Sequence, residues 1–356
     1  MTNPDDQTDL TEELAARVSE ACASRSPLRI VGGGTKRFYG RDVDGEPLEL
    51  AGHRGLVYYE PTELVVKARA GTRLQTIEAA LAEAGQMLAA EPPHFGEGAT
   101  LGGAVAAGLS GPRRPFAGSL RDQILGVTLL NGRGERLRFG GEVIKNVAGY
   151  DVSRLMAGAL GTLGVLLDIS LKVAPRPRLE KTKAVEVSAE RALEILAEWG
   201  ARPSSMSAAC FDGARLVCRF GGSESAVGAA SELFGGEELA QAESFWLDLR
   251  EQRHPFFAGD ESLWRISLPL GAPLLPLSGT WMLDWGGAQR WYRGPESAAV
   301  IRAAAVDAGG HATLFRGTAS ERFHPLDPVS AALQRRVKDA LDPRGILNPG
   351  RLYESL

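Results

Sequence analysis

Apolar residues recur at every fourth position from Leu10 to Cys22, which is the spacing that lines one face of a helix. The same helical spacing returns at residues 72–84 and at 327–341, so helices are expected in all three places. Short apolar runs bounded by glycine, proline or asparagine predict strands elsewhere. The strands expected in the first half of the chain are 28–31, 64–70, 124–130, 135–139 and 165–173.

In the last of these strands apolar residues occupy every second position from Val165 to Val173, the pattern of a sheet with one buried face. A proline-rich segment at 175–178 follows at once and stops both helix and strand. We therefore place a domain boundary after residue 175. The domains expected are 1–175, with subdomains of about 1–58 and 59–175, and 176–356.

The second half begins with a strand–helix–strand–strand–helix order that predicts a ferredoxin-like unit. These elements are expected at 184–187, 191–199, 208–211, 214–220 and 225–234. Strands at 264–270, 280–285 and 312–315, with an alanine-rich helix at 298–308, are interpreted as a partial repeat of the unit. The fold class predicted for the whole chain is α+β.

Charge and cysteine content narrow the function classes. The formal net charge is −4 with 24% charged residues, and no block of Lys and Arg interleaves with aromatic residues, so nucleic acid is not expected as a partner. The three cysteines are widely spaced without a C-x-x-C, which argues against a disulfide framework or an iron–sulfur cluster. Since no run reaches about 18 apolar residues, no integral membrane segment is expected.

Three glycine-rich segments interrupt the first half, at residues 32–36, 98–104 and 161–164. A single segment of this kind is most often a tight turn. A dinucleotide, however, needs several close approaches of the backbone, at its pyrophosphate and beside its rings, and three segments in one domain match that need. No G-x-G-x-x-G opens a helix after any of them, so a Rossmann fold is excluded.

Several motifs together carry a resemblance to a known family. They are RIVGGGTK from Arg29, GATLGG from Gly98, LRDQILG from Leu120, KNVAGYD from Lys145 and GTLG from Gly161. These resemble the FAD-binding domain of the vanillyl-alcohol oxidase (PCMH) type, and the sequence DPRGILNPGRL from Asp342 is similar to the ending of its hydroxy-acid branch. In total length and in residues 145–164 the chain is most similar to the FAD-binding subunits of glycolate oxidases.

The resemblance implies a two-subdomain PCMH-type FAD-binding domain followed by a ferredoxin-like α+β domain, whose last dozen residues return to the flavin domain. It implies that the first glycine segment holds the pyrophosphate and that the second flanks the ribityl chain and the isoalloxazine. The residues expected to contact FAD are Val31, Gly32, Gly33, Gly34, Thr35, Lys36, Pro93, Gly98, Ala99, Thr100, Gly102, Gly103, Asp122, Gly149, Tyr150, Asp151, Gly161, Gly164, Val165 and Asn348.

Some members of the family attach FAD through a histidine near the first glycine segment, where Thr35 and Lys36 stand in this chain. Non-covalent FAD is therefore expected, and His94 is interpreted as a loop residue. For Asp151, a helix N-cap and a cofactor contact are equally good hypotheses. The pair of arginines at 113–114 is interpreted as a solvated loop rather than an anion site.

Oxidation of a hydroxy acid requires a base beside the hydroxyl group and cations for the carboxylate. No complete set is evident, and the five histidines show no metal-ligand spacing, so no metal is expected. His324 is the best single candidate for the base, with Arg316 and Arg322 as carboxylate partners, although packing is the favoured role for each. The six tryptophans all follow residue 198 and are expected in the core.

The leading hypothesis is the FAD-binding subunit of a glycolate (2-hydroxy acid) oxidase complex, which oxidises glycolate to glyoxylate and passes electrons through the flavin to a partner. The partners implied by the resemblance are a second FAD subunit and an iron–sulfur subunit, in the cytoplasm or peripherally at the inner face of the membrane. Two alternatives stay open: a self-sufficient FAD-dependent oxidoreductase of another small hydroxy acid, and a flavin-bearing assembly subunit without turnover of its own.

Overall fold

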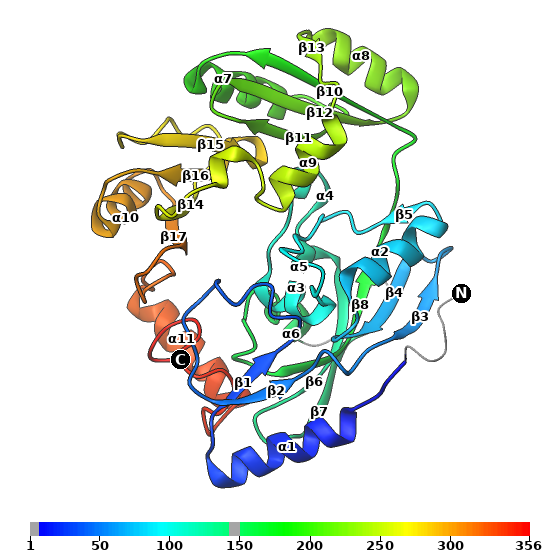
Figure 1. Cartoon of the computed structure of the whole chain (residues 1–356), viewed down its shortest axis with the longest axis vertical. Helices are drawn as coiled ribbons and strands as arrows, with labels where there is room; N and C mark the ends of the chain where they lie inside the picture. The colour runs from blue at the N-terminus through cyan, green and yellow to red at the C-terminus, as the bar shows by residue number, and fades with distance from the viewer. Residues whose placement is uncertain (1–6, 142–149) are drawn as a thin grey trace. The chain divides into compact units, whose positions relative to one another are not determined.

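The computed structural model describes residues 7–141 and 150–356 (Figure 1). Helices and strands are mixed throughout, which confirms the predicted α+β class. The chain divides into two compact units. Unit 1 comprises Met1–Leu109, Ser119–Arg176 and Pro325–Leu356, and unit 2 comprises Ser110–Gly118 and Pro177–His324.

Unit 1 is built on a parallel strand pair and a five-stranded antiparallel sheet. The pair is formed by β1 (Leu28–Val31) and β2 (Glu46–Glu49) after helix α1 (Thr11–Ser24). The sheet has the order β3-β4-β8-β6-β7. The bounds of its strands are Leu56–Glu60 (β3), Val65–Arg69 (β4), Ile124–Leu130 (β6), Arg136–Gly140 (β7) and Val165–Lys172 (β8).

One continuous apolar core joins both parts of unit 1. Helix α2 (Leu74–Glu83) contributes Leu74, Ile77 and Leu81, which are fully buried together with Leu48 of β2. Strand β8 buries its alternating apolar residues here, but Leu166 and Ser170 on its other face are also buried, so the expectation of a single buried face is wrong. The remaining elements of the unit are short or lie near its ends: β5 (Gln86–Met87), α3 (Leu101–Ala107), α5 (Leu120–Gln123), α6 (Val152–Leu155), β9 (Ala174–Pro175) and α11 (Pro328–Leu341).

Unit 2 contains an eight-stranded sheet in the order β13-β10-β12-β11-β15-β16-β14-β17. Its first four strands are β10 (Leu179–Glu186), β11 (Met206–Phe211), β12 (Arg215–Gly222) and β13 (Glu237–Glu238). Helix α7 (Ala189–Gly200) follows the first strand and helix α8 (Glu224–Phe234) follows the third. The chain order β-α-β-β-α-β is that of the ferredoxin-like unit, and the prediction is confirmed.

The other half of the sheet repeats the same strand order without the first helix. Its elements are β14 (Leu263–Ser267), β15 (Thr280–Asp284), β16 (Gln289–Arg293), α10 (Ala298–Asp307) and β17 (His311–Arg316). A loop over residues 268–279 takes the place of the missing helix. The halves join where β11 pairs with β15, at Phe211 and Leu283. The interpretation as a partial repeat agrees with this topology.

The six tryptophans, which from the sequence are expected in the core, differ in their burial. Trp199, Trp246, Trp264 and Trp291 are buried, whereas the two tryptophans at 281 and 285 are only partly buried. Trp246 belongs to helix α9 (Ala242–Arg250), and its indole N–H donates to the Thr182 hydroxyl at 3.0 Å. The buried tryptophans therefore fill the cores of unit 2, as expected.

Residues 110–118 belong to unit 2, although the chain on both sides of them belongs to unit 1. This segment contains the short helix α4 (Arg114–Ala117). Arg113 is buried and donates to the Glu180 carboxylate at 2.7 Å, while the Arg114 guanidinium lies 4.2 Å from the centre of the Trp285 ring. The interpretation of a solvated arginine pair is therefore wrong for Arg113, because an ion pair satisfies its buried charge.

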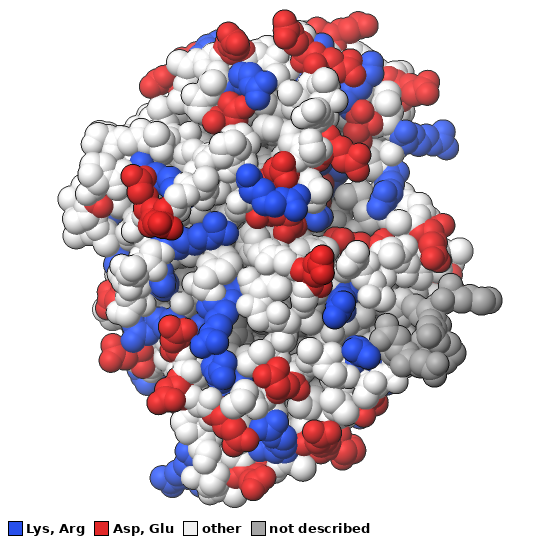
Figure 2. All heavy atoms as spheres, viewed as in Figure 1, with Lys and Arg blue, Asp and Glu red and all other residues white. Residues whose placement is uncertain are grey.

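Acidic and basic side chains are intermixed over the face of the molecule drawn in Figure 2. Within residues 7–141 and 150–356, no helix combines the length and the apolarity that crossing a bilayer requires.

Candidate functional site

A cavity of about 240 Å³ lies in unit 1 at the place where all three glycine-rich segments meet. Its walls come from β1 and the loop after it, from α3, from residues 160–166 and from the C-terminal segment. Twelve of the residues expected to contact FAD line it. They are Val31, Gly32, Gly33, Gly34, Thr35, Lys36, Thr100, Gly102, Gly103, Gly161, Gly164 and Asn348.

The first two glycine segments pack against each other, backbone to backbone. A Cβ atom built on Gly33 would lie 1.5 Å from the carbonyl oxygen of Gly98, so no larger residue fits there without moving the chain. Gly34 differs, because it has a φ of +72° and a Cβ atom built on it would meet nothing within 4 Å. Gly33 thus holds the wall together, and Gly34 faces the open space that a ligand can fill.

Lys36 supplies a cation at the rim of this space. Its side chain is buried, and the ammonium group donates to the His94 carbonyl at 3.1 Å and to the Thr35 hydroxyl at 3.3 Å. The ammonium nitrogen also lies 5.6 Å from the centre of the Phe95 ring. These contacts hold the positive charge beside the backbone of the first glycine segment, an arrangement suited to phosphate groups.

The C-terminal segment closes the cavity from the other side. The side-chain oxygen of Asn348 accepts from the Ile30 amide at 2.7 Å, and its amide nitrogen donates to the Leu160 carbonyl at 2.6 Å. Arg351 donates to the carbonyls of Tyr39 (2.7 Å) and Arg37 (2.9 Å) and to that of Arg41. Both side chains therefore fix loops of the cavity that lie far from them in the sequence.

The other expected contact residues do not line the cavity. Gly98 and Ala99 lie behind its wall, and Pro93 and Val165 are buried away from it. Three more lie elsewhere in unit 1. Asp122 caps α5 by accepting from the Ser119 amide (2.8 Å), Asp151 caps α6 by accepting from the Arg154 amide (3.2 Å), and Tyr150 is 96% exposed. Gly149 lies outside the described residues.

Sequence patterns missed half of the cavity wall. The additional lining residues are Arg29, Ile30, Arg37, Asp42, Val43, Leu50, Ala70, Ala106, Ala107, Leu160, Leu166 and Arg351. For Ala106 and Ala107 a signal was present, because the run of small residues in the second glycine segment continues to Gly108. The others reach the wall only through tertiary pairing.

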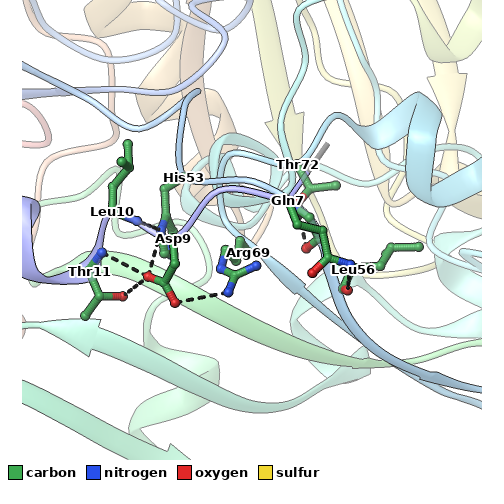
Figure 3. A network of polar contacts seen from close by, with 9 residues as sticks. Gln7, Asp9, Leu10, Thr11, His53, Leu56, Arg69 and Thr72 are labelled. Atoms are coloured by element: carbon green, nitrogen blue, oxygen red, sulfur yellow. Dashed lines mark hydrogen bonds and ion pairs between the residues drawn. The ribbon is translucent and has the colours of Figure 1, made fainter. Parts of the chain in front are cut away.

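A polar network ties the N-terminal segment to Arg69 of β4, the residue before the cavity-lining Ala70 (Figure 3). Asp9 accepts from the Thr11 hydroxyl at 2.7 Å and from the Arg69 guanidinium at 3.0 Å. Its pKa is held well below the usual range, chiefly by the Thr11 hydroxyl. Fully buried His53 accepts from the Leu10 amide at 3.1 Å, and burial lowers its pKa, so the ring is neutral at pH 7.

No histidine or cysteine lines the cavity, and all five histidines and all three cysteines of the sequence fall in the described part of the chain. His94 turns to α2 instead, where its Nε2 lies 3.1 Å from a Glu78 carboxylate oxygen. Residues 7–141 and 150–356 also contain no group of three metal-ligating side chains. The cavity therefore offers backbone amides and cations, but no side chain of the type expected for a covalent flavin link.

The weak catalytic candidates all lie in unit 2, at and after β17. The His324 ring accepts from the Ala312 amide at 3.4 Å, and burial lowers its pKa. Arg322 donates to the Gly317 carbonyl at 2.6 Å. Burial lowers the pKa of Arg316, and the neighbouring charge of Arg293 lowers it further. Since Nδ1 of His324 is an acceptor, the neutral ring carries its proton on Nε2 and is a poor base in this state.

Comparisons with known proteins agree with the geometry of unit 1. The family described as "FAD binding domain" matches residues 8–140, and "FAD linked oxidases, C-terminal domain" matches residues 317–352. Glycolate oxidase subunit GlcE of Escherichia coli (strain K12) is 49% identical over 350 residues, which are 98% of this chain and 99% of the relative. D-lactate dehydrogenase of Anaerostipes hadrus is 32% identical over 171 residues, 47% of this chain and 35% of the relative. Glycolate oxidase subunit GlcD of Bacillus subtilis (strain 168) is 33% identical over 103 residues, 28% of this chain and 22% of the relative.

Solved structures with low sequence identity share the fold. 4-Ethylphenol oxidase from Gulosibacter chungangensis aligns with a TM-score of 0.70 at 16% identity, covering 99% of this chain and 91% of that one. Alkyldihydroxyacetonephosphate synthase aligns with a TM-score of 0.66 at 14% identity, covering 95% and 75%. The expected cofactor, FAD, and the expected enzyme class, an FAD-dependent oxidoreductase, are confirmed by the family matches. The chain belongs to the family of FAD-linked oxidases that includes the glycolate oxidase subunit GlcE.

Proposed function

We propose that this chain is the FAD-binding subunit of a glycolate (2-hydroxy acid) oxidase complex that converts glycolate to glyoxylate. The observation that carries the proposal is the cavity where three glycine segments meet, in a chain that is 49% identical to GlcE over nearly its whole length. When bound, FAD supplies a two-electron acceptor for oxidation of the alcohol. The chain's own residues bind and orient that acceptor.

In this proposal the pyrophosphate lies against the segment from Gly32 to Lys36. Backbone amides of that segment donate hydrogen bonds, the Lys36 ammonium offsets the negative charge, and the open space beside Gly34 leaves room for the ligand. Thr100, Gly102 and Gly103 flank the ribityl chain and the isoalloxazine. Gly161, Gly164 and Asn348 complete the wall.

Substrate handling in this proposal involves unit 2. Arg316 and Arg322 are proposed to bind the carboxylate of a small 2-hydroxy acid, because guanidinium groups pair with carboxylates in a bidentate manner. His324 would have to release the Ala312 amide before its Nδ1 could accept a proton. We infer that a partner subunit contributes to catalysis or to electron exit.

The partners proposed are a second FAD subunit and an iron–sulfur subunit. The partial match to GlcD supports a partner with a related flavin domain. Two of the three cysteines are buried on β11 and β12, where burial raises the pKa of each thiol, so they are unsuited to ligate iron. An iron–sulfur partner would carry the electrons onward, in a complex that is cytoplasmic or peripheral at the inner face of the membrane.

The test compares the purified chain with a reconstituted complex. We expect about one FAD per chain from its visible absorption, slow glycolate-dependent reduction of a dye by the chain alone, and much faster reduction with its partners. Full activity of the lone chain would favour a self-sufficient oxidoreductase. A folded chain that takes up no FAD would refute the proposal.

A further inference from the structure

Helix α11 buries a charged residue and leaves part of its apolar face exposed. The sequence pattern places Val329, Leu333, Val337 and Leu341 on the core side of this helix. Leu341 packs against the core of unit 1, but Val329 is 78% and Leu333 is 58% exposed. The buried residue of α11 is Lys338. Since burying an ammonium group is costly unless every proton is satisfied, acceptors for all three protons of Lys338 are expected nearby.

The Lys338 ammonium group has three acceptors, which match its three protons. It donates to the carboxylate of Asp342 at 2.7 Å, to the Thr162 carbonyl at 2.7 Å and to the Leu347 carbonyl at 2.8 Å. The fully buried Asp342 also accepts from the amides of Ile346 (3.1 Å) and Leu347 (2.8 Å). One ion pair thus connects α11 with two separate loops.

Both loops end in the wall of the proposed FAD site. Thr162 is the neighbour of Gly161 in the chain, and Leu347 is the neighbour of Asn348. Gly161 and Asn348 both line the cavity. A Cβ atom built on Gly161 would lie 2.7 Å from the Asn348 side-chain nitrogen, so the two loops are in tight contact there. The ammonium group of Lys338 holds the backbone of both loops from behind, one residue away from the cavity.

We propose that Lys338 is a positioning residue for the FAD site, which sets the spacing between the Gly161 loop and Asn348 through the Thr162 and Leu347 carbonyls. This inference rests on the proposed location of FAD in the cavity. Helix α11 carries this side chain to the two loops, while two of its apolar residues, Val329 and Leu333, stay exposed. Loss of the Lys338 contacts allows the two loops to separate and weakens the cofactor site.

The experiment separates positioning from simple stability. Lys338→Met removes the donor and leaves the Asp342 carboxylate buried, whereas the double variant Lys338→Met/Asp342→Asn removes both charges. Because neutralising a buried pair removes the penalty of an uncompensated charge, we expect the double variant to regain much of the thermal stability that the single variant loses. The two loop carbonyls still lack a donor, so FAD affinity should stay roughly tenfold or more below that of the unaltered chain.

Affinity is measured by titrating flavin-free protein with FAD, with flavin circular dichroism as a second readout, well below the melting temperature of each variant. Arg336→Met, an exposed position on the same helix, is the matched control and should bind FAD normally. Affinity that recovers together with stability in the double variant would overturn the positioning role. If the unaltered chain bound no FAD, the proposed function itself would fail.

Discussion

Gly34 and Gly85 form a matched pair for testing whether FAD occupies the cavity. Both have a positive φ, +72° and +66°, and a Cβ atom built on either meets no atom within 4 Å. Only Gly34 lines the cavity, whereas Gly85 follows helix α2 at an exposed position. The substitutions Gly34→Leu and Gly85→Leu should therefore cost similar stability, about 1–2 kcal/mol, for the left-handed backbone.

Their effects on FAD affinity should differ widely. The leucine side chain at position 34 fills the space beside the first glycine segment, where the pyrophosphate is expected to accept hydrogen bonds from the backbone. Loss of two charge-assisted hydrogen bonds, at about 1.5 kcal/mol or more each, amounts to at least about 3 kcal/mol. That corresponds to a loss of affinity of roughly a hundredfold or more. Gly85→Leu should bind FAD as the unaltered chain does.

The assay titrates flavin-free protein with FAD and follows quenching of flavin fluorescence, with thermal unfolding of the same samples. Equal loss of affinity in both variants would show that backbone strain alone is responsible. Unchanged affinity of Gly34→Leu would refute the location of FAD in the cavity.

Two further predictions follow from the same unit. Since no histidine or cysteine lines the cavity, acid precipitation should release all flavin into the supernatant, and colour retained on the polypeptide would contradict non-covalent binding. Burial lowers the pKa of His53, so the imidazole binds a proton more readily in the unfolded chain than in the folded one. The contribution of His53 to the free energy of unfolding is therefore complete above pH 6.5, the ordinary pKa of histidine, and declines as the pH falls below it. His53→Asn, which keeps an acceptor for the Leu10 amide, should flatten the dependence of the melting temperature between about pH 7 and 5; an unchanged slope would show that another group is responsible.

Hydrophobic periodicity predicted the strands whose buried side chains are apolar. In β8 the alternating apolar residues are buried as predicted, although Leu166 and Ser170 on the other face of this central strand are buried too. Strand β16 was missed, although all five of its residues are buried, because its sequence QRWYR is mostly polar. Arg290 is buried by donating to the carbonyls of Gly287 and Pro273 and to that of Ala272. Hydrogen bonds of this kind depend on tertiary structure, so no local sequence pattern predicts them.

In the candidate site, too, the sequence predicted residues that local geometry restricts and missed residues that only the tertiary structure brings together. The glycine segments were visible because close backbone approach restricts the residue type, as the 1.5 Å separation at Gly33 illustrates. The cations Arg29 and Arg37 carry no such restriction and were not identified. Asp151 was equally consistent with a cap or a cofactor contact; its bond to the Arg154 amide confirms the cap, and the cofactor contact stays a prediction.

The discontinuity of unit 1 has a consequence for biosynthesis. The hydrogen bond between the Ile30 amide and the Asn348 side chain joins residues 318 positions apart, so one wall of the cavity is translated long after the opposite wall. During synthesis the glycine segments emerge early, and they lack their contact with the C-terminal segment until unit 2 has been made. A ribosome-bound chain that stops short of Asn348 lacks this wall of the cavity, so with FAD in the proposed place we expect flavin uptake only by chains whose synthesis is complete.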